Sequence, residues 1–148
     1  MLSSNTILGY GVLLSILIIG GVQDWHTGEV SNWITIPLFL MGVIASILRL
    51  FFWDNAPVGA LSLLATFVIT LAALKGWIGG ADWKVLTGLF GLYPLAGFAS
   101  LVVAGVWGGV AILITGERNA RFPGVTAFAF AACLTFFVKF SIILLNEV

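Results

Sequence analysis

Charged side chains are scarce in this chain of 148 residues, which has six Lys or Arg, six Asp or Glu and no net charge. A chain with so little charge and 61% hydrophobic residues lies far outside the usual composition of soluble domains. The neutral balance also gives no electrostatic reason to expect a nucleic-acid partner. The composition therefore predicts a protein embedded in the lipid bilayer.

Cysteine and histidine are almost absent as well. Cys133 is the single cysteine, which excludes an internal disulfide and a thiolate cluster for structural zinc. His26 is the single histidine, and with no second His or Cys near it, ordinary interfacial packing is favoured over metal binding. We therefore expect neither a metal nor a cofactor.

Long segments without charge dominate what is present. Each is near or above the length of about 20 residues that crosses the hydrocarbon of a bilayer. They are residues 1–23, 30–48, 55–74, 85–116 and 122–138. The fourth contains Tyr93-Pro94, where a missing backbone donor would break a helix, so we divide it into two. The pattern predicts an all-α polytopic fold, a bundle of six transmembrane helices in one domain of residues 1–148. The expected helices are 4–22, 31–52, 57–75, 82–93, 95–115 and 123–146.

The fourth expected helix is short, because its 12 residues reach only about 18 Å. Asp82 at its start can then lie below the membrane surface, next to the irregular Gly79-Gly80 backbone. Irregular backbone is tolerated at that depth only beside protein or a water-filled cavity. We therefore expect a hydrated cavity beside this helix.

Positive charges predict the orientation of the chain. The connections after the first, third and fifth helices carry Lys75, Lys84, Arg118 and Arg121, whereas the opposite connections carry no Lys or Arg within them. The side richer in Lys and Arg is normally the cytoplasm. Arg49 and Lys139 lie near the opposite ends of their helices and can reach the outer interface. This places both termini outside.

Two aspartates lie at the edges of these segments, Asp24 after the first helix and Asp82 at the start of the fourth. Ionised carboxylates are costly near hydrocarbon, so acidic residues kept there are functional candidates. The orientation places both toward the cytoplasmic face, where they can meet. Two carboxyl groups that share one proton can act as the acid and the base of peptide hydrolysis.

The motifs around these aspartates resemble the type IV prepilin peptidases and preflagellin peptidases. Asp24 is followed after five residues by Val30-Ser31-Asn32, and Asp82 closes Gly79-Gly80-Ala81-Asp82 and is followed by Trp83-Lys84. The order of the motifs, their side and the helices that carry them match the family over nearly the whole chain. An Arg121-Phe122-Pro123-Gly124 segment is loosely similar to the Pro-containing loop before the family's last helix.

The resemblance implies a GxGD-type intramembrane aspartic protease. Asp24 and Asp82 match the catalytic positions, with Gly79, Gly80, Ala81, Lys84 and Asn32 as supporting residues. The implied substrate is a pilin-like or archaellin-like precursor, whose basic leader is cleaved from a hydrophobic helix at the cytoplasmic side of the membrane. The motifs leave open which aspartate is the base.

Two features depart from the family pattern. Ala81 replaces the second glycine of Gly-x-Gly-Asp, which resembles the version with Gly-Gly-Ala-Asp in archaeal members. The chain also has no room for the cysteine-rich region and methyl-transfer activity of larger bacterial members. The resemblance therefore implies a short form that only cleaves.

Other classes of function remain open at this point. A small transporter or channel subunit could use the same aspartates to relay protons or cations. Against this, only one glycine-rich break is evident, whereas transporters commonly repeat such breaks in two halves. A non-catalytic scaffold would tolerate Asp24→Asn and Asp82→Asn. The presenilin-like proteases share Gly-x-Gly-Asp, but their Tyr-Asp and Pro-Ala-Leu motifs are missing here.

Overall fold

The protein is a bundle of six α-helices in a computed structural model that describes residues 4–52, 55–116 and 123–146. The helices are α1 (Ser4–Thr27), α2 (Asn32–Phe51), α3 (Ala56–Leu74), α4 (Gly80–Leu92), α5 (Pro94–Thr115) and α6 (Gly124–Asn146). All except α4 are long and apolar enough to cross a membrane. The prediction of an all-α polytopic fold with a short fourth helix is confirmed.

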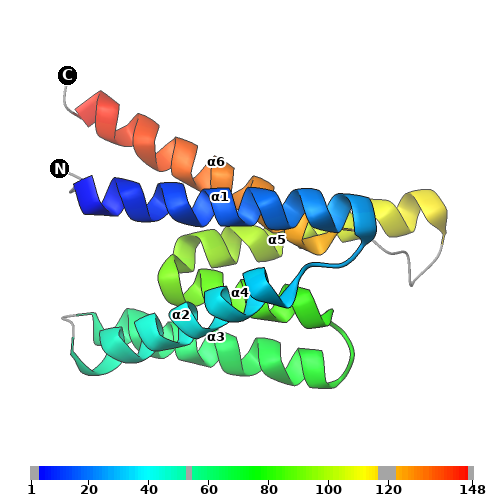
Figure 1. Cartoon of the computed structure of the whole chain (residues 1–148), viewed down its shortest axis with the longest axis horizontal. Helices are drawn as coiled ribbons and strands as arrows, with labels where there is room; N and C mark the ends of the chain where they lie inside the picture. The colour runs from blue at the N-terminus through cyan, green and yellow to red at the C-terminus, as the bar shows by residue number, and fades with distance from the viewer. Residues whose placement is uncertain (1–3, 53–54, 117–122, 147–148) are drawn as a thin grey trace.

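The helices run alternately up and down, so that the ends of α1, α3 and α5 and the starts of α2, α4 and α6 lie at one end of the bundle (Figure 1). Both chain ends lie at the other end. Of the four cations that predicted the orientation, Lys75 and Lys84 lie at the first of these ends, and Arg118 and Arg121 lie outside the described residues. We call the first end the loop end.

Helix α4 is the centre of the bundle. It contacts α2, α3, α5 and α6, and every residue from Val85 to Gly91 is buried. A helix that is apolar on all sides is suited to such a central place. At 13 residues it extends only about 20 Å, so it does not cross the bilayer alone. Its start lies beside the end of α1 and the starts of α2 and α6.

Helices α2 and α4 approach each other with almost no side-chain layer between them. A Cβ atom added at Gly42 of α2 would lie 2.5 Å from the Cα atom of Gly88 in α4. One added at Gly91 would overlap the Gly42 carbonyl group. Small residues allow such close packing between membrane helices. This contact fixes the position of α4, and with it the position of Asp82.

Arg49 of α2 makes a contact with the end of α4 that the sequence did not predict. Its guanidinium donates hydrogen bonds to the carbonyl groups of Gly91 and of Leu92, the latter at 2.7 Å. The last carbonyl groups of a helix have no partners within it. Because α4 ends among the other helices, these carbonyl groups need a donor from the protein, and Arg49 of α2 provides it.

The last turn of α1 also differs from the sequence prediction, which ended this helix at residue 22. The helix continues to Thr27, and Gly28 follows with a φ of +69°. Glycine is the residue that adopts this left-handed conformation without strain, and it commonly terminates helices. Asp24 therefore lies inside α1 and not after it.

Candidate active site

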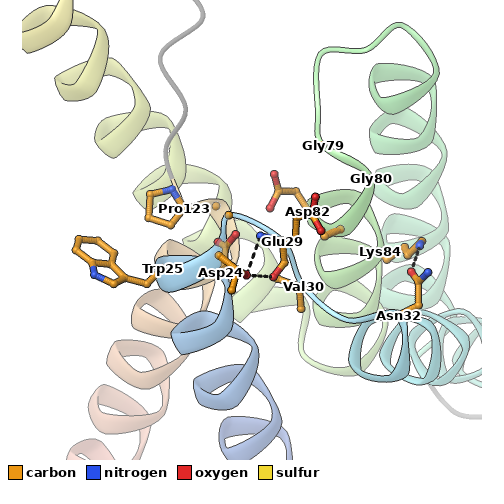
Figure 2. Close-up of a pocket in the computed structure, with 14 residues that line it drawn as sticks. Asp24, Trp25, Glu29, Val30, Asn32, Gly79, Gly80, Asp82, Lys84 and Pro123 are labelled. Atoms are coloured by element: carbon orange, nitrogen blue, oxygen red, sulfur yellow. Dashed lines mark hydrogen bonds between the residues drawn. The ribbon is translucent and has the colours of Figure 1, made fainter.

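A cavity of about 800 Å³ opens at the loop end, between the end of α1 and the starts of α2, α4 and α6. The residues singled out in the sequence all line it: Asp24, Asn32, Gly79, Gly80, Ala81, Asp82 and Lys84. Figure 2 shows Asp24 on one side of this space and Asp82 on the other. The cavity beside the fourth helix was expected from the irregular Gly79-Gly80 backbone.

Asp24 is held by the first turn of α6. Its side chain is 8% exposed, and its Oδ2 atom accepts hydrogen bonds from the backbone N–H groups of Val125 (2.9 Å) and Thr126 (3.3 Å). The Thr126 hydroxyl also donates to the carbonyl oxygen of Gly21 at 2.7 Å, which joins the two helices one turn away. The free N–H groups at the start of a helix suit a negative charge. The start of α6 thus fixes Asp24 toward the cavity.

Asp82 lies in the first turn of α4, after the N-cap residue Gly79. A Cβ atom added at Gly79 would lie 2.9 Å from Asp82 Oδ2, and one added at Gly124 would lie 2.5 Å from Asp82 Oδ1. The carboxyl group therefore occupies a space that two glycines leave open. Burial, and next the negative charge of Asp24, raise the pKa of Asp82 to about 6. Both effects disfavour its ionised form.

Lys84 and Asn32 join the two sequence motifs. The Lys84 Nζ atom donates to the Asn32 side-chain oxygen at 2.9 Å, which links the starts of α4 and α2 (Figure 2). Lys84 follows Asp82 by two residues, so a regular helix turns it away from that carboxyl group. The sequence motifs included both residues but did not identify Asn32 as the partner of Lys84. The pair lies at the edge of the cavity.

Glu29 also lines the cavity, although the sequence analysis did not select it. It lies in the short connection from α1 to α2, and Figure 2 shows it between Asp24 and Asp82 in this view. The Thr27 hydroxyl donates to the Glu29 carbonyl oxygen at 2.8 Å and accepts from the Glu29 N–H at 3.2 Å. The sequence could have predicted this position of Glu29, because a connection this short forces its residues to lie beside Asp24 and Asn32.

Gly124 is a second residue that sequence reasoning missed. The Arg121-Phe122-Pro123-Gly124 segment suggested a similarity of loops but no role for its glycine. Pro123 and Gly124 line the cavity, and Arg121 and Phe122 lie outside the described residues. The signal was weak, since the importance of Gly124 comes from its spatial contact with Asp82, which is far from it in the sequence.

The described part of the site includes acidic and polar groups and glycines. Within the described part of the chain, no three His, Cys, Asp or Glu side chains are grouped to hold a metal ion. Two carboxyl groups, from Asp24 in α1 and Asp82 in α4, line the cavity in different surroundings. Such a pair can take up and release protons around a bound water molecule.

Comparison with known protein families gives a match over most of the chain. The family model described as "Type IV leader peptidase family" matches residues 11–138, which include both aspartates, Glu29 and Gly124. No curated protein and no solved structure matches the chain.

Proposed function

Because the chain belongs to the type IV leader peptidase family, we propose that it is an aspartic endopeptidase in which Asp24 and Asp82 are the catalytic pair. The observation that carries the proposal is that the two carboxyl groups, 58 positions apart in the sequence (82 − 24), line one cavity. Family membership supports a peptidase in general, and this pair supports the aspartic type. The supporting residues are Gly79, Gly80, Ala81, Lys84 and Asn32.

The reaction follows from the proton capacity of two carboxyl groups. One carboxylate takes a proton from water as the water oxygen attacks the carbonyl carbon of the peptide bond, and the other carboxyl group donates its proton to the carbonyl oxygen. Collapse of the tetrahedral intermediate breaks the C–N bond. The leaving nitrogen gains the proton taken from water, and a hydroxyl of the intermediate returns a proton to the acid. Both groups end as they began.

The proposed substrate is a precursor with a basic leader followed by a hydrophobic helix. The described part of the cavity wall supports a basic partner, because it has three acidic side chains, Asp24, Glu29 and Asp82, and its one lysine, Lys84, donates to Asn32. The helix of the precursor would remain in the bilayer beside the bundle. Cleavage would then fall at the boundary between the leader and this helix, at the level of the loop end.

We further propose that the loop end faces the cytoplasm and that both termini lie outside the cell membrane. Lys75 and Lys84 at the loop end, with Arg118 and Arg121 in the sequence between α5 and α6, support this orientation. The basic leader and the acidic cavity would then meet in the same compartment.

Conduction of protons or cations is the competing function for the same aspartates. A conducting path needs polar groups or water through the whole bundle. After Asp82, α4 instead carries apolar side chains that are buried in the bundle, none of them more than 2% exposed: Val85, Leu86, Leu89 and Phe90. This apolar packing favours a site that is closed on one side, as a peptidase requires.

The test uses the full chain, purified in detergent or reconstituted in lipid. We expect it to cleave a precursor with a basic leader and a hydrophobic helix once, at the boundary between them. Mass spectrometry of both products gives the position of the cut. A panel of such precursors that all remain intact would contradict the proposal, whereas proton or cation flux through liposomes would support the competing function.

Glu29 provides a test of the substrate's charge. Glu29→Gln keeps the shape of the side chain but removes a charge that we expect to attract the leader. The contribution of one exposed charge pair is modest, so KM should rise about threefold to tenfold while kcat stays within about twofold. Steady-state kinetics with the basic precursor measure this.

The control for Glu29 is a precursor in which the basic residues of the leader are replaced by glutamine. Wild type and Glu29→Gln should cleave that precursor with equal KM, because a neutral leader has no charge for Glu29 to attract. A difference in KM that persists with the neutral leader would mean that Glu29 acts on the fold of the site and not on the substrate's charge.

A further inference from the structure

The first turn of α6 contacts both aspartates, but in different ways. Two of its N–H groups, from Val125 and Thr126, donate to Asp24. Its first residue, Gly124, lies against the carboxyl group of Asp82, where an added Cβ atom would lie between 2.5 and 2.9 Å from Oδ1, Cγ and Oδ2. One element of three residues therefore fixes the surroundings of both candidate catalytic groups.

These surroundings differ in how well they accommodate a negative charge. A backbone N–H group can only donate, so the Asp24 oxygen that receives two of them is matched by an ionised carboxylate. Asp82 also lies at the start of a helix, but among the described residues no N–H group donates to its carboxyl group. Its oxygen atoms lie instead against Gly79 and Gly124, whose CH2 groups offer an anion little stabilisation.

We infer that the first turn of α6 assigns the two catalytic roles, with Asp24 as the base that takes a proton from water and Asp82 as the acid that protonates the carbonyl oxygen. Gly124 and Thr126 are positioning residues in this arrangement. Gly124 leaves the space that the acid occupies, and Thr126 holds the N–H donors against the base through its bond to Gly21. The inference rests on the proposed peptidase function and adds the assignment of each aspartate.

Few other charges face this pair. In the described part of the cavity wall they are Glu29 from the α1–α2 connection and Lys84 from α4, and neither α2 nor the described part of α6 contributes a charged side chain. His26 lies on the wall of a separate apolar hollow between α1 and α6. Glu29 adds a negative charge near both aspartates and so does not by itself distinguish them.

The acid is tested with Gly124→Ala, which places a methyl group in the space of the Asp82 carboxyl group. We expect kcat to fall about 100-fold, because a displacement of about 1 Å in a catalytic group has an effect of this size, and KM to stay within about twofold. The alkaline limb of the pH–kcat profile should move to lower pH, since the displaced carboxyl group is more hydrated and farther from Asp24. The acidic limb should stay in place. Gly105→Ala is the matched control, because an added Cβ atom there meets nothing within 4 Å.

The base is tested with Thr126→Val, which removes the bond to Gly21 but keeps the shape of the side chain. Looser N–H donors favour protonation of Asp24, so the acidic limb should move to higher pH and the alkaline limb should stay. Thr126→Ser restores the hydroxyl and should restore the profile. Thr135→Val controls for the loss of a hydroxyl on the same helix, because Thr135 donates only to Ala131 within α6.

Infrared titration of the carboxyl groups tests the same assignment without a substrate. We expect the carboxyl band that persists to the higher pH to disappear in Asp82→Asn and to remain in Asp24→Asn. The reverse pattern, or variants that move the opposite limbs, would overturn the assignment. Profiles of Gly124→Ala and Thr126→Val that match those of their controls would overturn the role of α6. Failure of wild type to cleave any precursor would count against the proposed function, whereas the infrared result would still decide the assignment.

Discussion

Asp24→Asn and Asp82→Asn should each abolish cleavage, with kcat lower by about 10⁴-fold. General acid or base catalysis contributes about 10²- to 10⁴-fold, and each aspartate acts in both steps of the reaction. Asparagine has nearly the same shape as aspartate but cannot take up or release the proton. Single-turnover cleavage of a precursor with a basic leader, followed over hours, measures losses of this size.

The double variant is the more discriminating measurement. The effects of groups that act as a unit are strongly non-additive, so the protein with both substitutions should be about as inactive as either single variant.

The melting temperature of each variant is the control for a structural role of the carboxyl group. Removing a partly buried carboxyl group lowers the desolvation cost, so neither variant should unfold at a lower temperature than wild type. Cleavage that survives either substitution would contradict the two-aspartate mechanism, and unchanged cleavage in both would support a scaffold.

The sequence predicted the helices well because lipid leaves the chain few choices. In hydrocarbon every backbone N–H and C=O group must be paired internally, so long uncharged segments become helices. The break at Tyr93-Pro94 was predicted correctly for the same reason, since proline cannot donate. The end of α1 was predicted too early, because a charge at Asp24 does not stop a helix when its carboxyl group accepts hydrogen bonds from the start of another helix.

Contacts between helices were much less predictable. In a bilayer the outer and inner faces of a helix are both apolar, so the hydrophobic pattern does not reveal which face meets a neighbour. The contact of Lys84 with Asn32, the place of Gly124 against Asp82 and the bonds from Arg49 to the end of α4 all depend on helix rotation. The sequence indicated that Asp24 and Asp82 share one end of the bundle, but the role of α6 between them needed the structure.

Gly42→Ala should be among the most destabilising single substitutions of a small residue away from the cavity. Its methyl group would lie 2.5 Å from the Cα atom of Gly88 and 2.6 Å from the carbonyl oxygen of Thr87. Both are backbone atoms, so no side chain can rotate away, and α2 and α4 must separate. Overpacking in a well-packed core costs about 1–3 kcal/mol, and a backbone overlap should reach at least the upper end of this range.

Thermal unfolding in detergent, followed by near-UV circular dichroism, measures this loss. Gly109→Ala on α5 is the matched control, since an added Cβ atom there meets nothing within 4 Å, and it should change the melting temperature little. Because the contact of α2 with α4 sets the position of Asp82, any Gly42→Ala protein that remains folded should also cleave more slowly, with KM nearly unchanged. Equal stability of the two variants would mean that α2 and α4 do not meet through Gly42, and the position of Asp82 would then not depend on this contact.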